Sequence, residues 1–318
     1  MIIEVIIFLA GLVALSWSAD RFVYGASALA TNLGVSSMVI GLTIVAMGSS
    51  APEIVVSAIA SWNNNPNTAV GNAIGSNITN IALVLGLTAL FKPLIVSSST
   101  VRREMPVLLA VTLLAIYFLS DGQMVFYEGM VLICLFFFSI GGLTWMSLHV
   151  EKGDPLQAET EDEIPQGVPI KKAIFWVVVG LIALPLSAHF MVESAVQIAR
   201  YFGLSELIIG LTIIALGTSL PELAASIAGV MKGEDDLALG NIIGSNIFNL
   251  LAVLAMPGLL APGFIDENVA SRDIFAMLLM TVLLIVFSFN FRGTRRINRW
   301  EGAVLITCYL AYCTLLFI

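Results

Sequence analysis

Charged residues are scarce in this chain. Asp, Glu, Lys and Arg make up 11% of its 318 residues, whereas 58% are hydrophobic. A soluble globular chain is typically about a quarter charged and about half apolar. Because the polar groups here are too few to cover the apolar surface in water, we predict an integral membrane protein.

Cysteine and histidine are also rare, at three and two residues. Cys134, Cys308 and Cys313 lie in apolar stretches without CxxC spacing, so we expect buried, inert thiols rather than metal or redox ligands. No basic patch with interleaved aromatic residues is present, which argues against nucleic-acid binding. Six of the 22 acidic residues lie between residues 151 and 163, a pattern typical of a solvated connector.

Ten apolar stretches can supply spanning helices, each of which needs roughly 20 residues. They lie near residues 2–18, 36–61, 69–91, 105–120, 124–148, 173–199, 205–231, 237–260, 274–291 and 300–318. The first has no basic n-region and no clear cleavage site, so we expect a spanning helix rather than a signal peptide. Gly, Pro and polar residues interrupt the second, third, seventh and eighth stretches.

The basic residues predict the orientation. With the N-terminus outside, the inward loops hold 12 of the 14 Lys and Arg residues, beginning with Arg21. Basic residues concentrate in cytoplasmic loops of membrane proteins. We therefore expect the plasma (inner) membrane, with both termini on the extracellular or periplasmic side and the acidic connector in the cytoplasm.

Two motifs occur twice. The run Gly41–Glu53 matches Gly210–Glu222 at nine of 13 positions, and Gly71–Asn80 matches Gly240–Asn249 at eight of ten. Both pairs share an offset of 169 residues. Chance does not hold one register over that distance, so the two halves of the chain are duplicates.

Each half contains five of the expected spans. Since five is odd, equivalent helices cross the membrane in opposite directions, as in the inverted repeats of many secondary transporters. The predicted fold is therefore an all-α membrane protein of ten helices in two inverted five-helix repeats. We expect repeats at 1–148 and 173–318, joined by a cytoplasmic acidic linker at 149–172, with the interrupted helices 2, 3, 7 and 8 forming an ion site.

Glu53 and Glu222 lie well inside apolar spans. An ionised side chain at the bilayer centre costs at least about 2.5 kcal/mol, and no Lys or Arg lies within the four motif helices to offset this. Two carboxylates that face each other need a cation between them or protons on them. We therefore interpret this pair as the centre of a cation site.

Oxygen donors surround both glutamates. Ser49 and Ser50 precede Glu53 by one helical turn, and Thr218 and Ser219 do the same for Glu222. The partner motifs carry i,i+4 pairs, Ser76 with Asn80 and Ser245 with Asn249. Pro52 and Pro221 donate no backbone hydrogen bond, so the carbonyls of Gly48 and Gly217 are freed as further donors. Calcium and sodium suit such a shell, whereas the absence of His and Cys argues against zinc, copper and iron.

Charge balance favours exchange. One calcium neutralises two carboxylates, and so would two or more sodium ions, whereas the empty site would carry two bare charges. A carrier that moves only when loaded is an antiporter. Two alternatives stay open: a calcium/proton exchanger, in which protons neutralise the glutamates, and a cation channel that uses them for selectivity. An intramembrane hydrolase is disfavoured because the repeats contain no His or Lys to act as a base, so we expect no enzyme.

At these motifs the chain resembles prokaryotic members of the sodium/calcium exchanger family, in the calcium/cation antiporter superfamily. The resemblance implies sodium and calcium as transported ions, with no resident cofactor and no obligate protein partner besides the lipid bilayer. It implies that Glu53 and Glu222 are the central calcium ligands. It assigns the remaining calcium and sodium contacts to Ser49, Thr218, Ser50, Ser219, Ser76, Ser245, Asn80 and Asn249, and to the backbone of Ala46 and Ala215. Asn at position 249, where potassium-dependent relatives carry Asp, implies potassium independence.

Overall fold

The computed structural model describes residues 2–148, 167–203, 215–289 and 295–316, and it is almost entirely helical. The first half contains α1 (Ile2–Leu33), α2 (Ser37–Ile40), α3 (Ala46–Ser49), α4 (Ala51–Trp62), α5 (Pro66–Thr79), α6 (Gly86–Phe91), α7 (Ser98–Arg102), α8 (Glu104–Leu119) and α9 (Phe126–Leu148), with π-helical segments η1 (Gly41–Val45) and η2 (Asn80–Leu85). The second half contains α11 (Ile170–Tyr201), α13 (Ala215–Thr218), α14 (Leu220–Met231), α15 (Asp235–Phe248), α16 (Ala255–Leu260), α17 (Ile274–Ser288) and α18 (Arg299–Leu315), with η4 (Asn249–Val253) and η5 (Val269–Asp273).

Several helices are long and apolar enough to cross a membrane. Within the described ranges there are five: Ile2–Leu33, Pro66–Phe91, Ile170–Tyr201, Asp235–Leu260 and Val269–Ser288. A sixth results if Ser37–Ser49 and Ala51–Trp62, which meet at a bend of 44°, form one span. The protein is therefore a helical, multi-pass membrane protein, and the count of ten spans stays a prediction. Residues 204–214, which begin the seventh expected span and the second copy of the first motif, lie outside the described residues.

The prediction that the first helix ends near residue 18 is wrong. The helix α1 continues to Leu33, and its 32 residues span about 48 Å, more than the ~30 Å of a hydrocarbon core. Arg21 therefore lies within a helix and not in a loop. Its charge and that of Asp20 are tolerated there because Lys232 Nζ lies 2.8 Å from Asp20 Oδ1 and the Arg21 guanidinium lies 5.2 Å from the centre of the Trp176 ring.

Helix boundaries recur at the offset found in the sequence. The helices α4, α5 and α6 begin and end 169 residues before α14, α15 and α16, and η2 and η4 both begin at the repeated asparagine, Asn80 or Asn249. The expected interruption of the third and eighth spans takes a milder form, because Pro66–Phe91 and Asp235–Leu260 are continuous helices that widen into π-helical segments. Such segments occur frequently at functional sites.

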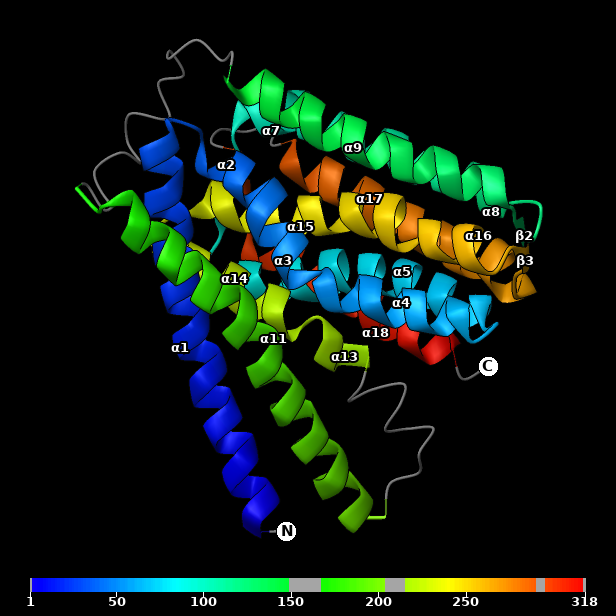
Figure 1. Ribbon diagram of the computed structural model, residues 1–318, viewed down its shortest axis with the longest axis horizontal. Coiled ribbons are helices and arrows are strands. Elements are labelled where there is room, and N and C mark those ends of the chain that lie inside the picture. The colour runs from blue at the N-terminus through cyan, green and yellow to red at the C-terminus, as the bar shows by residue number, and fades with distance from the viewer. Residues whose placement is uncertain (1, 149–166, 204–214, 290–294, 317–318) are drawn as a thin grey trace.

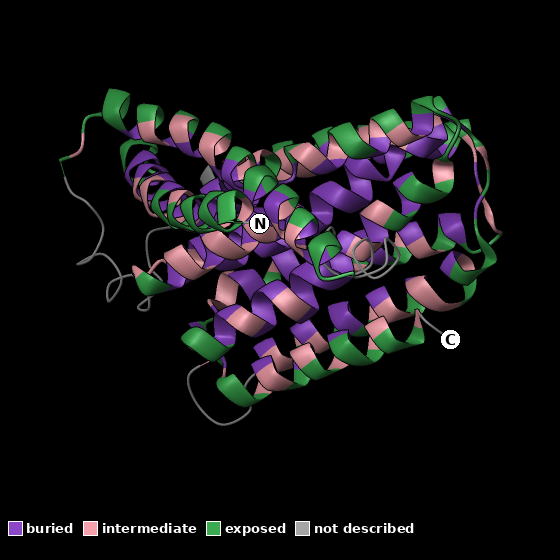
Figure 2. Ribbon diagram, turned by 90° about the horizontal axis from the view of Figure 1, so that it is seen from below, coloured by how far each residue is buried: buried purple, intermediate pink, exposed green. Residues whose placement is uncertain are grey.

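The core lies where the repeated helices meet, in the middle of the body in Figure 2. The most hydrophobic stretch of Asp235–Leu260 is entirely buried. Close contacts hold the segment from Met38 to Ala46 against α15, where a Cβ added at Gly240 would lie 2.5 Å from the Met38 carbonyl oxygen. Glycine permits this approach because it carries no side chain.

The helices α1 and α11 run side by side and extend beyond the rest of the body (Figure 1). Large apolar side chains are exposed along both, Val13 and Ile182 among them, as expected of a surface that faces lipid. The cysteine prediction fails for the same reason, since an apolar stretch can be covered by lipid rather than by protein. Cys134 on α9 is exposed, and Cys308 and Cys313 on α18 are partly exposed.

Two antiparallel strand pairs join distant loops. Strand β1 (Leu94–Ile95) pairs with β4 (Arg296–Ile297), and β2 (Gln123–Met124) pairs with β3 (Gly263–Phe264).

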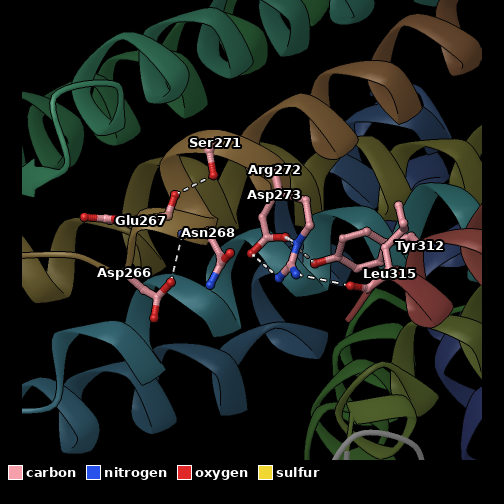
Figure 3. Close-up of polar contacts among 8 residues, drawn as sticks. All are labelled: Asp266, Glu267, Asn268, Ser271, Arg272, Asp273, Tyr312 and Leu315. Atoms are coloured by element: carbon pink, nitrogen blue, oxygen red, sulfur yellow. Dashed lines mark hydrogen bonds and ion pairs between the residues drawn. The ribbon is translucent and has the colours of Figure 1, made fainter. Parts of the chain in front are cut away.

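A polar network joins the last helix, α18, to η5 (Figure 3). Arg272 Nε lies 2.8 Å from Asp273 Oδ1, which also accepts a hydrogen bond from the Tyr312 hydroxyl at 3.2 Å. Arg272 Nη1 donates to the Leu315 carbonyl at 3.3 Å. An arginine near a helix C-terminus satisfies a carbonyl that has no partner within the helix.

Candidate ion-binding site

Two buried glutamates lie at the centre of the candidate site, each in the first turn of a helix. Glu53 follows Pro52 in α4, and Glu222 follows Pro221 in α14. Proline is favoured at the start of a helix because its missing N–H would have no partner there, and the helix dipole favours a negative charge at that end. Both glutamates are 1% exposed, so their carboxylates are withdrawn from solvent and lipid alike.

The two halves of the protein meet at these carboxylates. Ser50, which precedes α4, donates a hydrogen bond from its hydroxyl to Glu222 Oε1 at 3.1 Å. This hydrogen bond joins the turn before Glu53 to the carboxylate of Glu222, and the pairing of the two glutamates stays a prediction.

Hydroxyls from the first motif line the same region. Ser49 is buried, and its hydroxyl lies 3.2 Å from Asn241 Oδ1 and 3.4 Å from the Ala46 carbonyl oxygen. The Ala46 carbonyl also accepts a hydrogen bond from the Ser50 amide at 3.0 Å. That carbonyl can bind a cation only if Ser49 turns its hydroxyl away, toward Asn241.

In the second motif Thr218 ends α13, and Ser219 lies between α13 and α14. Ser219 is 2% exposed, and Thr218 is partly buried. Ala215 begins α13, and nothing is described of its side chain. The equivalents of Ser49 and Ser50 thus occupy equivalent places before the second glutamate.

Partner helices present the remaining candidates. Ser76 and Asn80 lie one turn apart at the end of α5, and Ser245 and Asn249 lie likewise at the end of α15; all four are buried. The helix α4 contacts η4, which begins at Asn249, and α14 contacts η2, which begins at Asn80. Each glutamate helix therefore packs against the π-helical segment of the opposite half.

Unpartnered oxygens concentrate on these residues. Among the described residues, eleven buried side-chain oxygens have no hydrogen-bond partner, and six of them belong to the predicted site. They are Glu53 Oε2, Glu222 Oε2, Ser219 Oγ, Ser245 Oγ, Asn80 Oδ1 and Asn249 Oδ1. A buried polar atom without a partner is costly, and a bound cation supplies the missing partner.

The donor set restricts the kind of ion. In the part of the chain that the structure describes, no three His, Cys, Asp or Glu side chains come together. A cation here would be held by two carboxylates and neutral hydroxyl, amide and carbonyl oxygens, which suits hard ions such as calcium and sodium.

Sequence reasoning missed four residues that contact the site. Asn72 and Asn241 donate hydrogen bonds to the backbone carbonyls of Glu53 and Glu222, and Ser57 and Ser226 accept from the same two amides. The signal was available, since both asparagines belong to the second repeated motif and the two serines differ by the same offset. Their hydrogen bonds could not be predicted from the sequence, because they depend on how α4 crosses α5 and how α14 crosses α15.

The fold and the site together define a class of protein: a helical membrane transporter with paired carboxylates buried among neutral oxygens. Comparison with known protein families identifies the family of this chain. The model of the family described as sodium/calcium exchanger protein matches residues 3–145 and 172–318, and the chain belongs to this family. Its members are exchangers that carry sodium and calcium across membranes.

Individual relatives match over their full length. The chain is 53% identical to CaxA of Alkalimonas amylolytica over 100% of this chain and 99% of that protein. It is 31% identical to the sodium/calcium exchanger MaX1 of Methanosarcina acetivorans, over 99% of each chain. The fold is similar to a solved structure of the sodium-calcium exchanger NCX_Mj, soaked with zero Na⁺ and Ca²⁺, with a TM-score of 0.85 and 33% identity over 99% of both chains.

Proposed function

We propose that this protein exchanges sodium for calcium across the membrane through the site around Glu53 and Glu222. The observation that carries the proposal is the set of six buried, unpartnered oxygens on the predicted ligands, two of them carboxylate oxygens. Six oxygens are within the six to eight that calcium commonly takes. Family membership supports the same ions, and MaX1 and NCX_Mj are both named as sodium/calcium exchangers.

The coupling follows from charge. One calcium ion neutralises the two carboxylates, and two or more sodium ions do the same in its place. The unloaded site holds two negative charges away from water, which is costly in a low-dielectric surrounding. The ion-bound forms therefore convert readily between the outward-open and inward-open conformations, and the empty form does not. Transport is then an obligatory exchange.

Alternating access by two inverted repeats is part of the proposal, with repeats at 1–148 and 173–318, a cytoplasmic linker at 149–172 and ten spans. The strand pairs support this topology, because paired strands must lie on one side of the membrane. Ten spans place the loops of β1 and β4 on the cytoplasmic side and those of β2 and β3 on the other. The matching helix boundaries support the duplication. Both termini are then extracellular or periplasmic, and the membrane is the plasma (inner) membrane.

Potassium independence rests on the amides of Asn80 and Asn249. Both are buried in equivalent places, and neither adds a third negative charge to the site. Two carboxylates are balanced by a single calcium, so no further cation is needed for neutrality.

The test is calcium-45 uptake into proteoliposomes loaded with sodium and diluted into sodium-free buffer. Potassium-loaded vesicles serve as the control, and external potassium is varied separately. The proposal expects uptake that requires internal sodium and does not respond to potassium. Uptake driven by a pH gradient without sodium would replace it with calcium/proton exchange, and single-channel currents in a planar bilayer would replace it with a channel.

A further inference from the structure

The side chain of Asn72 bridges two helices next to the site. Its amide nitrogen donates hydrogen bonds to the Glu53 carbonyl oxygen and to Ser57 Oγ, each at 3.1 Å. Ser57 in turn donates from its hydroxyl to the Ala69 carbonyl at 3.2 Å, back on α5. The helices α4 and α5 are thus joined at the turn that carries Glu53.

The second half contains the same bridge. The Asn241 amide nitrogen donates to the Glu222 carbonyl oxygen at 3.3 Å and to Ser226 Oγ at 3.1 Å. Asn241 and Ser226 are completely buried. Each residue lies 169 positions after its counterpart, so duplication has preserved the contact along with the glutamates.

The bridging asparagine shares a helix face with candidate ion ligands. Asn72, Ser76 and Asn80 are spaced four residues apart along one continuous helix, as are Asn241, Ser245 and Asn249 in the other half. Residues at this spacing lie one above the other on one face. At one end of that face the asparagine donates to the backbone carbonyl of the glutamate. The other end carries the serine hydroxyl and the second asparagine amide, which are candidate ion ligands.

We propose that Asn72 and Asn241 are positioning residues of the ion site, each fixing one glutamate relative to the helix that carries its facing ligands. The inference rests on the function proposed above. Asparagine suits the role because its amide has two N–H donors and each finds one acceptor here. Calcium–oxygen distances fall between about 2.3 and 2.6 Å, so a small displacement of one helix relative to the other weakens calcium binding.

Asn241 also contacts the first half of the protein, whose helix α3 packs against α15 (Figure 1). Its Oδ1 lies 3.2 Å from the Ser49 hydroxyl, which can donate its proton there instead of to the Ala46 carbonyl. A serine that coordinates a cation through its lone pairs must donate its proton elsewhere. Asn241 supplies that acceptor, and in this way it orients a candidate ligand of the first half while it holds the glutamate of the second.

The test compares Asn72→Ala with Asn77→Ala in sodium-driven calcium-45 uptake. Asn77 lies on the same helix and is 1% exposed, but its amide donates to the Ala73 carbonyl of its own helix at 2.8 Å. Because misplaced ligands cost affinity steeply, Asn72→Ala should raise the half-saturating calcium concentration roughly tenfold, with a maximal rate within about twofold of wild type. Asn77→Ala should leave the half-saturating concentration within about twofold.

A second pair of variants isolates the hydroxyl of Ser57. Thr and Val have the same shape, so Ser57→Thr and Ser57→Val meet the same neighbours, and only Thr keeps the hydroxyl. Ser57→Thr should retain the wild-type half-saturating concentration, and Ser57→Val should raise it.

The outcomes separate the two proposals. Suppose that the wild type is active. The positioning role is then overturned, and the exchange function is not, if Asn72→Ala keeps the wild-type half-saturating calcium concentration. The same holds if Asn72→Ala and Asn77→Ala both lower only the maximal rate. A wild type without sodium-driven calcium uptake overturns both.

Discussion

Replacing Gly244 by alanine should disturb the ion site through the backbone alone. A Cβ at this position would lie 2.6 Å from the Leu42 carbonyl oxygen and 2.7 Å from Ala46 Cβ. Ordinary contact begins at 3.4 Å, so the segment from Met38 to Ala46 and α15 must separate by about 0.8 Å. Neither contact is the flexible end of a side chain, so the strain cannot be relieved locally.

The expected cost combines two opposing effects. Overpacking a tight contact costs about 1–3 kcal/mol, and alanine recovers up to about 1 kcal/mol of helix propensity. A net loss of about 1–2 kcal/mol should lower the midpoint of thermal unfolding by several degrees. The same separation is about a third of a calcium–oxygen distance, so the Ser49 and Ser245 oxygens move apart and the half-saturating calcium concentration should rise roughly tenfold.

The assays are thermal unfolding of the purified protein in detergent and calcium-45 uptake into proteoliposomes. Gly141→Ala is the matched control, because Gly141 lies on the exposed side of α9 and no described atom lies within 4 Å of the added Cβ. The control should be neutral or slightly stabilising. Wild-type stability and calcium affinity in Gly244→Ala would refute the close packing of these two segments.

Three further results are expected. Ser50→Ala removes the hydrogen bond to Glu222 at 3.1 Å. Because hydrogen bonds to charged groups contribute about 1.5–3 kcal/mol, the variant should bind calcium at least about tenfold more weakly in calcium-45 uptake. Equal affinity in the variant would contradict this contact. Lys92→Met removes the donor to the Val230 carbonyl at 2.8 Å, near the C-terminus of α14, and should cost about 1 kcal/mol in thermal unfolding without a change in calcium affinity. Calcium at one hundred times its dissociation constant should stabilise the wild type by about 2.7 kcal/mol over protein in chelator, and an unchanged unfolding midpoint would argue against a calcium site.

The candidate site could be predicted from the sequence because its residue types and their spacing are local patterns. Glu53 and Glu222 stand out as acids in apolar stretches, and the repeated motifs supply the hydroxyls and amides around them. The structure places the described members of these motifs at the junction of the two halves, with unpartnered oxygens on six of them. The roles of individual ligands stay predictions that only ion measurements can test.

Other features depend on contacts between distant segments. The end of α1 was misplaced because two adjacent charged residues, Asp20 and Arg21, suggested a loop. In the structure they continue the helix, where Asp20 contacts Lys232 and Arg21 lies over the Trp176 ring. Cys134 was expected to be buried because hydropathy does not separate lipid contact from protein contact.

The bridge from Asn72 to Glu53 was missed for a related reason. A hydrogen bond between helices depends on their crossing, which periodicity within one helix does not describe.

The central claim is tested most directly by sodium-driven calcium-45 uptake in three proteins: wild type, Glu53→Gln and Glu222→Gln. Each substitution keeps the size of the side chain and removes one of the two buried charges. Uptake that depends on internal sodium in the wild type and is lost in both variants is the predicted result. Uptake by either variant at near wild-type rates would contradict the assignment of the ion site to this pair.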